Sequence, residues 1–210
     1  MPLAARPWLI AVLLSVLVFL PSSASAGMTP EEVKAFEGYR TLAEKGDRVA
    51  QSNLGVCYKN GEGVAKDQVQ AVSWYRKAAE QGLAVAQSNL GFCYDNGEGV
   101  AKDQVQAVSW YRKAAEQGLA VAQSNLGVCY DNGEGVAKDE IEAYAYYNLA
   151  GITDENARKN LAILEKKMSP DARLLGQQRT KQLQKEIEGR METLDDLRKA
   201  VEKESLRKGA

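Results

Sequence analysis

The sequence predicts an all-α protein, an α/α solenoid of antiparallel helix pairs with a helical C-terminal cap. Residues 50–85 and 86–121 are nearly identical, differing only at Val56/Phe92 and Lys59/Asp95, and a third copy begins at Ala122. A 36-residue period is typical of stacked repeats, because one short unit cannot bury its apolar face alone. Within each copy, apolar residues recur every three or four positions, which indicates helices.

The first helix of each unit has one apolar face, formed in the first copy by Ala50, Leu54, Cys57 and Tyr58. Gly55 lies on this helix and has no side chain to hold a neighbouring helix away. Asn60 is followed by Gly61, and we expect the helix to end there because glycine tolerates the left-handed conformation of a C-cap.

The second helix is predicted to begin with a capping box formed by Asp67 and Gln70, which Asp139 and Glu142 repeat in the third copy. Its apolar positions follow at spacings of three and four. We expect the ring of Trp74 to alternate there with small residues that admit the next repeat, and Gly82 to end the helix. The small residues are Ala71, Ala78 and Ala79.

The repeats divide the chain into three predicted parts. Residues 1–26 are a signal peptide, residues 27–151 the solenoid, and residues 152–210 a helical extension. Within the solenoid, residues 31–46 match only the second helix of a unit, so they are expected to form an N-terminal half-repeat. Full repeats then span about 47–82, 83–118 and 119–151, and the last is degraded, as terminal units of solenoids are.

The N-terminal segment has the three parts of a secretory signal peptide: Arg6, an apolar run from Trp8 to Leu20, and small residues before Gly27. We therefore expect export to a periplasm or out of the cell. A retained membrane anchor is the alternative, but a run of 13 residues is shorter than the roughly 20 that span a bilayer. The mature chain is expected to have no integral membrane span.

After Gly151 the period is lost. Thr153 could cap a helix that runs to Met168, and Ser169 before Pro170 is a strong signal for the start of another helix. Apolar residues then follow at near-heptad spacing, and Gly189 could break this helix; they are Leu183, Ile187, Leu194, Leu197 and Val201. Two interpretations stay open, a helix that caps the stack and a coiled coil through residues 170–208 that self-associates or binds a partner.

Composition excludes several classes of function. The chain has 27 basic and 28 acidic residues, so it lacks the basic surplus that nucleic acid binding requires. It contains no histidine, which excludes imidazole as a general base, nucleophile activator or metal ligand. We therefore expect no catalytic residue, cofactor or metal site, and no nucleic acid as the partner.

Three local motifs look like parts of functional sites but lack residues that those sites need. Ser205-Leu-Arg-Lys208 spells the S-x-x-K of penicillin-binding enzymes, but it lacks the companion motifs of those enzymes. The Asp131–Gly135 segment has glycines where a calcium loop needs oxygen ligands, and Gly61-Glu-Gly63 has an acid where a phosphate would bind. The last two segments are predicted to be turns.

Each repeat has one cysteine, Cys57, Cys93 or Cys129. Equivalent residues of stacked helices lie roughly 8–10 Å apart, beyond the ~7 Å limit between Cα atoms for a disulfide. We expect buried free thiols, with a mixed or intermolecular disulfide as the alternative.

The repeat resembles the Sel-one-like repeat (SLR), a relative of the tetratricopeptide repeat. Its pattern is Leu-Gly-x-x-Tyr-x-x-Gly-x-Gly-Val-x-x-Asp followed by Ala-x-x-Trp-Tyr-x-x-Ala-Ala-x-x-Gly, and it covers residues 31–151. The resemblance implies a right-handed superhelix that serves as a scaffold or adaptor for other proteins, in bacteria often in signalling, envelope assembly or host contact. A cysteine-rich secreted branch of the family is linked to β-lactamase-like activity, so a β-lactamase-like or cell-wall hydrolase is the alternative function. This chain departs from that branch, which has two cysteines per repeat.

Similarity to tetratricopeptide domains implies that one face of the first helices lines a concave groove. An asparagine there can hydrogen-bond the backbone of an extended peptide, the backbone of the adjoining repeat, or both. The two positions that differ between the first two copies share this face, which hints that the copies differ in what they bind. Chance drift after a duplication explains the two substitutions equally well. The candidate partner-binding residues are Ser52, Asn53, Val56, Lys59, Asn89, Phe92, Asp95, Asn125, Val128 and Asp131.

Overall fold

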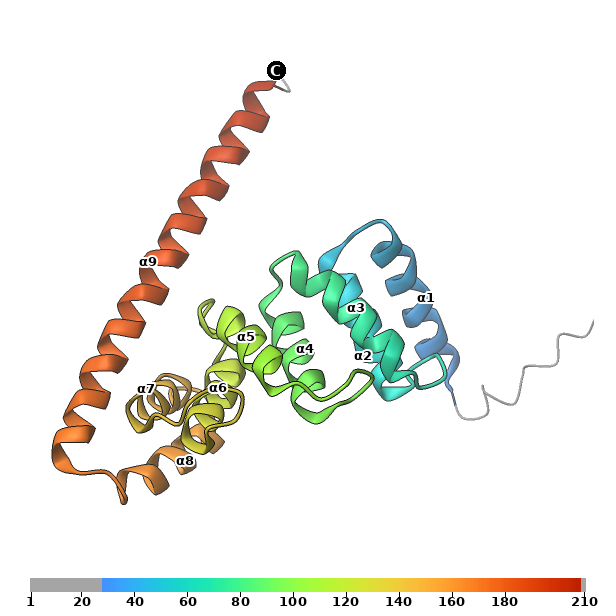
Figure 1. The fold of residues 1–210 in the computed structure, drawn as a ribbon. Coiled ribbons are helices and arrows are strands. Elements are labelled where there is room, and N and C mark those ends of the chain that lie inside the picture. Colours follow the sequence, from blue (N-terminus) through green and yellow to red (C-terminus); the bar gives the residue numbers. More distant parts are fainter. Residues whose placement is uncertain (1–27, 209–210) are drawn as a thin grey trace, which may run out of the picture.

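The computed structural model describes residues 28–208, with side chains as far as Lys199 except Leu197, so the predicted signal peptide lies outside the described residues. The described residues form nine α-helices and no strand: α1 (Pro30–Glu44), α2 (Arg48–Asn60), α3 (Gln68–Glu80), α4 (Ala84–Asn96), α5 (Gln104–Ala115), α6 (Ala120–Asn132), α7 (Glu140–Ala150), α8 (Glu155–Glu165) and α9 (Pro170–Lys208). From α1 to α8 each helix packs on the next one, and α9 returns to pack on α7 (Figure 1). The all-α solenoid is confirmed.

Each helix pair is held by a tyrosine ring that packs against a glycine. Tyr75 of α3 is only 1% exposed, and a Cβ added to Gly55 of α2 would lie 2.6 Å from its ring. Gly91 and Gly127 have the same relation to Tyr111 and Tyr147. The prediction that Gly55 admits a close neighbour is therefore confirmed.

The predicted burial of Trp74 is wrong. Trp74 is only half-buried, and the Nζ atom of Lys77 lies 3.7 Å from the centre of its ring. One residue corresponds to 100° of rotation in a helix, so Tyr75 and not Trp74 points between the two helices. Trp74 lies at the edge of the hairpin.

Glycines in the turns also set the spacing between repeats. Gly63, Gly99 and Gly135 adopt left-handed backbone conformations, with φ of 68° to 70°. A Cβ at Gly99 would collide with the carbonyl of Gln68, at the start of α3, and one at Gly135 with the carbonyl of Gln104. The turn of each repeat thus abuts the second helix of the repeat before it, which only glycine allows.

The predicted capping boxes form only in part. The carboxylate of Asp67 accepts a hydrogen bond from the backbone N–H of Gln70, and Asp139 does the same for Glu142, but neither side chain is bonded back to its cap. The carboxylate of Glu142 instead binds Arg179 of α9 at 2.7 Å. A complete capping box occurs at Thr29 and Glu32, which the sequence analysis did not identify.

Buried glutamines connect successive repeats. Each donates from Nε2 to a carbonyl in the last turn of the preceding helix: Gln51 to Ala43 at 3.2 Å, Gln87 to Ala79 at 3.1 Å and Gln123 to Ala115 at 3.3 Å. The side-chain oxygens of Gln51 and Gln87 in turn accept from Gln81 and Gln117, at 2.7 Å in both cases. These carbonyls already accept the backbone N–H groups of Gly46, Gly82 and Gly118, so each glutamine adds a second hydrogen bond that joins one repeat to the next.

The C-terminal helices differ from the prediction in two details. Helix α8 is capped by Asp154 and not by Thr153, since the Asp154 carboxylate accepts from the backbone of Asn156 at 2.8 Å. Helix α9 begins at Pro170, with Ser169 as predicted bonded to the N–H of Ala172, but it runs unbroken through Gly189. A glycine costs only about 1 kcal/mol in a helix, and strong helix formers flank this one.

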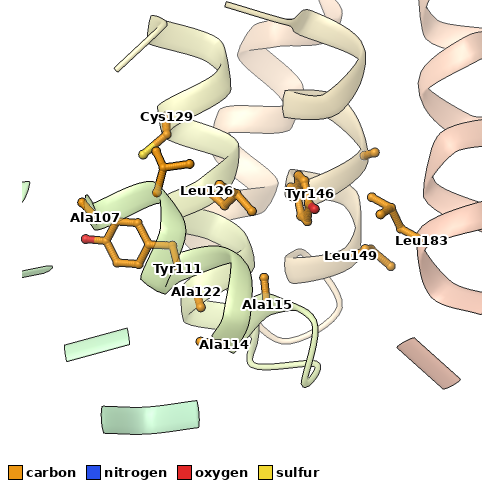
Figure 2. Packing of buried hydrophobic residues seen from close by; sticks show 12 residues of the cluster. Ala107, Tyr111, Ala114, Ala115, Ala122, Leu126, Cys129, Tyr146, Leu149 and Leu183 are labelled. Atoms are coloured by element: carbon orange, nitrogen blue, oxygen red, sulfur yellow. The ribbon is translucent and has the colours of Figure 1, made fainter. Parts of the chain in front are cut away.

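Helix α7 has an outer face adapted to α9. Ala145 and Leu149 stand where α5 has Ser109 and Lys113, so this face lacks the hydroxyl and the charge. Leu183 of α9 is buried against the resulting apolar surface, beside Leu149 (Figure 2). Helix α8 packs on α6 and α7 and thereby covers the end of the stack.

All three cysteines are free and buried, as predicted. Burial raises the pKa of the Cys93 thiol to about 11 and that of Cys129 to about 12, chiefly by desolvating the thiolate, and raises the pKa of Cys57 for the same reason. The thiols are therefore protonated at neutral pH.

Replacement of Tyr75 by Ala is expected to destabilise the protein by roughly 3–5 kcal/mol, because it empties the space next to Gly55. Trp74→Ala is expected to cost clearly less, since that ring is half-exposed. Urea unfolding followed by circular dichroism measures both. Equal losses of stability would contradict the assignment of Tyr75 as the central residue.

The native protein is expected to react slowly with a disulfide reagent such as dithionitrobenzoate at about pH 8, because the raised pKa values keep the buried thiols neutral. The same reagent in guanidinium chloride should release a signal for three thiols. Rapid reaction of the folded chain would show that the cysteines are accessible.

Candidate functional site

The candidate site is the outward face of α2, α4 and α6. We call it the first-helix face. It consists of Val49, Asn53, Val56 and Lys59 of α2, of Val85, Asn89, Phe92 and Asp95 of α4, and of Val121, Asn125, Val128 and Asp131 of α6.

Nine of the ten predicted residues are at least partly exposed on this face, and one is not. Ser52 is 4% exposed, and the equivalent Ser88 and Ser124 are buried too. Ser52 lies beside the buried Gln51, one residue from Asn53 and hence turned by 100° toward the packed side of the helix. Ser52 is therefore packed inside the repeats and does not lie on the exposed face with the other nine residues.

A row of valines was missed by the sequence analysis. Val49, Val85 and Val121 are 52%, 49% and 50% exposed, although every repeat has a valine at this position. Each lies four residues before its asparagine, so both side chains are on the same side of the helix. A valine repeated outside the core pattern was the signal that could have revealed the row.

The asparagines of the first-helix face keep their hydrogen-bonding groups available. Asn53, Asn89 and Asn125 are partly exposed, and within residues 28–208 none of their side chains forms a hydrogen bond. The bond to the adjoining repeat, the alternative that the sequence left open, is made by the buried glutamines instead. An amide offers two donors and an acceptor to a ligand.

The two positions at which the first copies differ meet across a repeat boundary. The Nζ atom of Lys59 lies 4.2 Å from the centre of the Phe92 ring and 3.9 Å from a carboxylate oxygen of Glu98. At the next boundary the equivalent positions are Asp95 and Val128, which cannot form this cation–π contact. The two boundaries therefore present different chemistry, basic and aromatic at the first, acidic and aliphatic at the second.

A hollow of about 140 Å³ lies between α5, α6, α7 and α9, and its cations are all engaged. Arg112 donates to the hydroxyl of Tyr130 at 3.0 Å, Arg179 to Glu142 at 2.7 Å and Arg190 to Glu116 at 2.7 Å. The two ion pairs, Arg179 with Glu142 and Arg190 with Glu116, fix α9 on the repeats, while Arg112 is hydrogen-bonded to a neutral hydroxyl.

The described part of the chain lacks the arrangements that a metal site or a membrane span would need. Among residues 28–208, no cluster of three or more cysteine and acidic side chains is placed to hold a metal ion. None of the helices described there is both long and apolar enough to span a lipid bilayer. The S-x-x-K segment falls in the last turns of α9.

Comparison with known proteins identifies the repeat. The Sel1 repeat family model matches residues 48–83, 84–119 and 120–151. A Sel1 repeat protein from Oxalobacter formigenes is 38% identical with a TM-score of 0.56, over 63% of this chain and 58% of that one. The chain is 36% identical to c5321, a protective antigen present in uropathogenic Escherichia coli strains displaying an SLR fold, with a TM-score of 0.48, over 77% of this chain and 44% of that one. The chain spans less than two thirds of the length of either structure, and no curated protein matches it.

Helices α2 to α7 correspond to the three matched units, and the N-terminal α1 and the C-terminal α8 and α9 flank them. Sel1 repeats generally mediate contacts between proteins and are typically non-catalytic. The repeat region of this chain therefore belongs to the Sel1 repeat family.

Proposed function

We propose that the chain is an exported, non-enzymatic adaptor that binds an extended segment of another protein along the first-helix face. The observation that carries this proposal is the repeated pair of a half-exposed valine and an asparagine without a hydrogen-bonding partner, present on α2, α4 and α6. The valines offer apolar contacts and the asparagines offer donors and acceptors. An extended peptide uses apolar contacts for its side chains, and donors and acceptors for its backbone.

The spacing of the repeats supports this kind of ligand. Lys59 of α2 reaches the ring of Phe92 on α4, so side chains of successive first helices meet across a repeat boundary. An extended segment can therefore contact more than one first helix at once.

The charges of the face indicate the chemistry of the segment. Lys59 lies at the α2 end, where Glu98 already partly neutralises it, while Asp95 and Asp131 follow on α4 and α6. We therefore expect basic side chains in the part of the ligand that contacts α4 and α6, and aliphatic side chains opposite the valines.

Selection of random peptides of about twelve residues on the purified protein tests the proposal. Peptides with alternating aliphatic and basic residues are expected, and their affinity should fall at least roughly tenfold for the variant N53A/N89A/N125A and for V85S/V121S. The matched control is V69S/V105S, because these valines of α3 and α5 are 65% and 66% exposed on the second helices. Equal binding by all variants would remove the first-helix face from the function.

Export is the second part of the proposal and rests on residues 1–26. Cell fractionation is expected to find the protein outside the cytoplasm, with Gly27 as its first residue by N-terminal sequencing. A cytoplasmic protein that retains residues 1–26 would refute it.

A further inference from the structure

Helix α9 is docked on the repeats along only its first half. A Cβ at Gly176 would lie 2.6 Å from the ring of Tyr144, Leu183 is buried against α7, and Arg190 forms an ion pair with Glu116 of the α5–α6 turn. Beyond this ion pair the helix leaves the repeats and projects away from them (Figure 1). With 39 residues, α9 is about 58 Å long.

The apolar stripe of α9 does not stop where the docking stops. Ile187 is packed against the repeats, and Met191 and Leu194 follow it at helical spacing but are 53% and 54% exposed. In the sequence, Leu197 and Val201 continue the same near-heptad spacing. Such a stripe on a projecting helix is typical of a coiled-coil seam.

A hollow of about 180 Å³ lies where α9 leaves the repeats. It is lined by Met191 and Leu194 together with Arg190, Glu116 and Gln117. No described side chain fills it. It offers an apolar contact to a helix that runs beside the projecting half of α9.

The charges of the projecting half are divided into two blocks. Residues 191–196 contain three acidic residues and no basic one, whereas residues 197–208 contain five basic and two acidic residues. Two copies side by side in parallel would place the acidic blocks against each other. In the antiparallel arrangement each acidic block lies against the basic block of the other copy, which is favourable.

We propose that the projecting half of α9, residues 191–208, pairs with the same segment of a second copy as an antiparallel helical pair, which makes the protein a dimer. The docked half already supplies the nucleus of the helix, so pairing needs only to stabilise turns that extend an existing helix. The dimer would hold two first-helix faces on one rod-like connection.

Light scattering of the purified full chain during size-exclusion chromatography measures its mass. The expected result is twice the mass of one chain, which is 22.9 kDa for all 210 residues and lower for a chain that begins at Gly27. Leu194→Ser should weaken the dimer at least roughly tenfold, whereas Leu174→Ser, equally exposed at 54% in the docked half, should leave it unchanged. A mass of one chain at all concentrations, or a dimer that Leu194→Ser does not weaken, would overturn the proposal.

Charge reversal tests the orientation. E192K/D195K/D196K alone and K199E/K203E/R207E alone should each dissociate the dimer, because like charges then face each other in the antiparallel pair. The six substitutions together should restore it. Single sets without effect, or a combined variant that stays monomeric although its circular dichroism is unchanged, would rule out antiparallel pairing.

Discussion

Contact between a tyrosine ring and a glycine sets the distance between the two helices of every repeat. A buried aromatic ring removes roughly 150–250 Å² from water, but in this fold it can be buried only because Gly55, Gly91 and Gly127 have no side chain. The close approach in turn brings the flanking alanines into contact, and a core of small residues results. The contacts between repeats depend on this distance, because it sets the thickness of each hairpin that is stacked.

The stacking of hairpins depends on two further contacts that recur in register. The turn glycines allow each loop to abut the preceding second helix, and the buried glutamines donate a second hydrogen bond to carbonyls in the last turn of that helix. Both contacts use the backbone of the neighbouring repeat. They therefore tolerate changes on the outer surface, and this leaves the first-helix face free to vary at Lys59 and Phe92.

The last repeat shows how the same framework is adapted to a different neighbour. Helix α7 has Leu149 where α3 and α5 have Lys77 and Lys113, and those lysines lie over the rings of Trp74 and Trp110. A lysine at this position keeps the outer face of a second helix in water. Its loss on α7 creates the surface on which the first half of α9 docks, and the second helices that keep this lysine lack such a surface.

The sequence by itself determined the helical solenoid, because the 36-residue period and the helical spacing of apolar residues depend only on local order along the chain. It also predicted the glycine at the helix contact, the buried thiols and the start of α9. Tertiary structure alone decided which of Trp74 and Tyr75 is buried, since adjacent residues differ only in direction relative to a neighbour that the sequence does not place. The same reason explains why Ser52 proved buried, why Val49 proved exposed, and why Lys59 meets Phe92: each depends on the contact between helices of successive repeats.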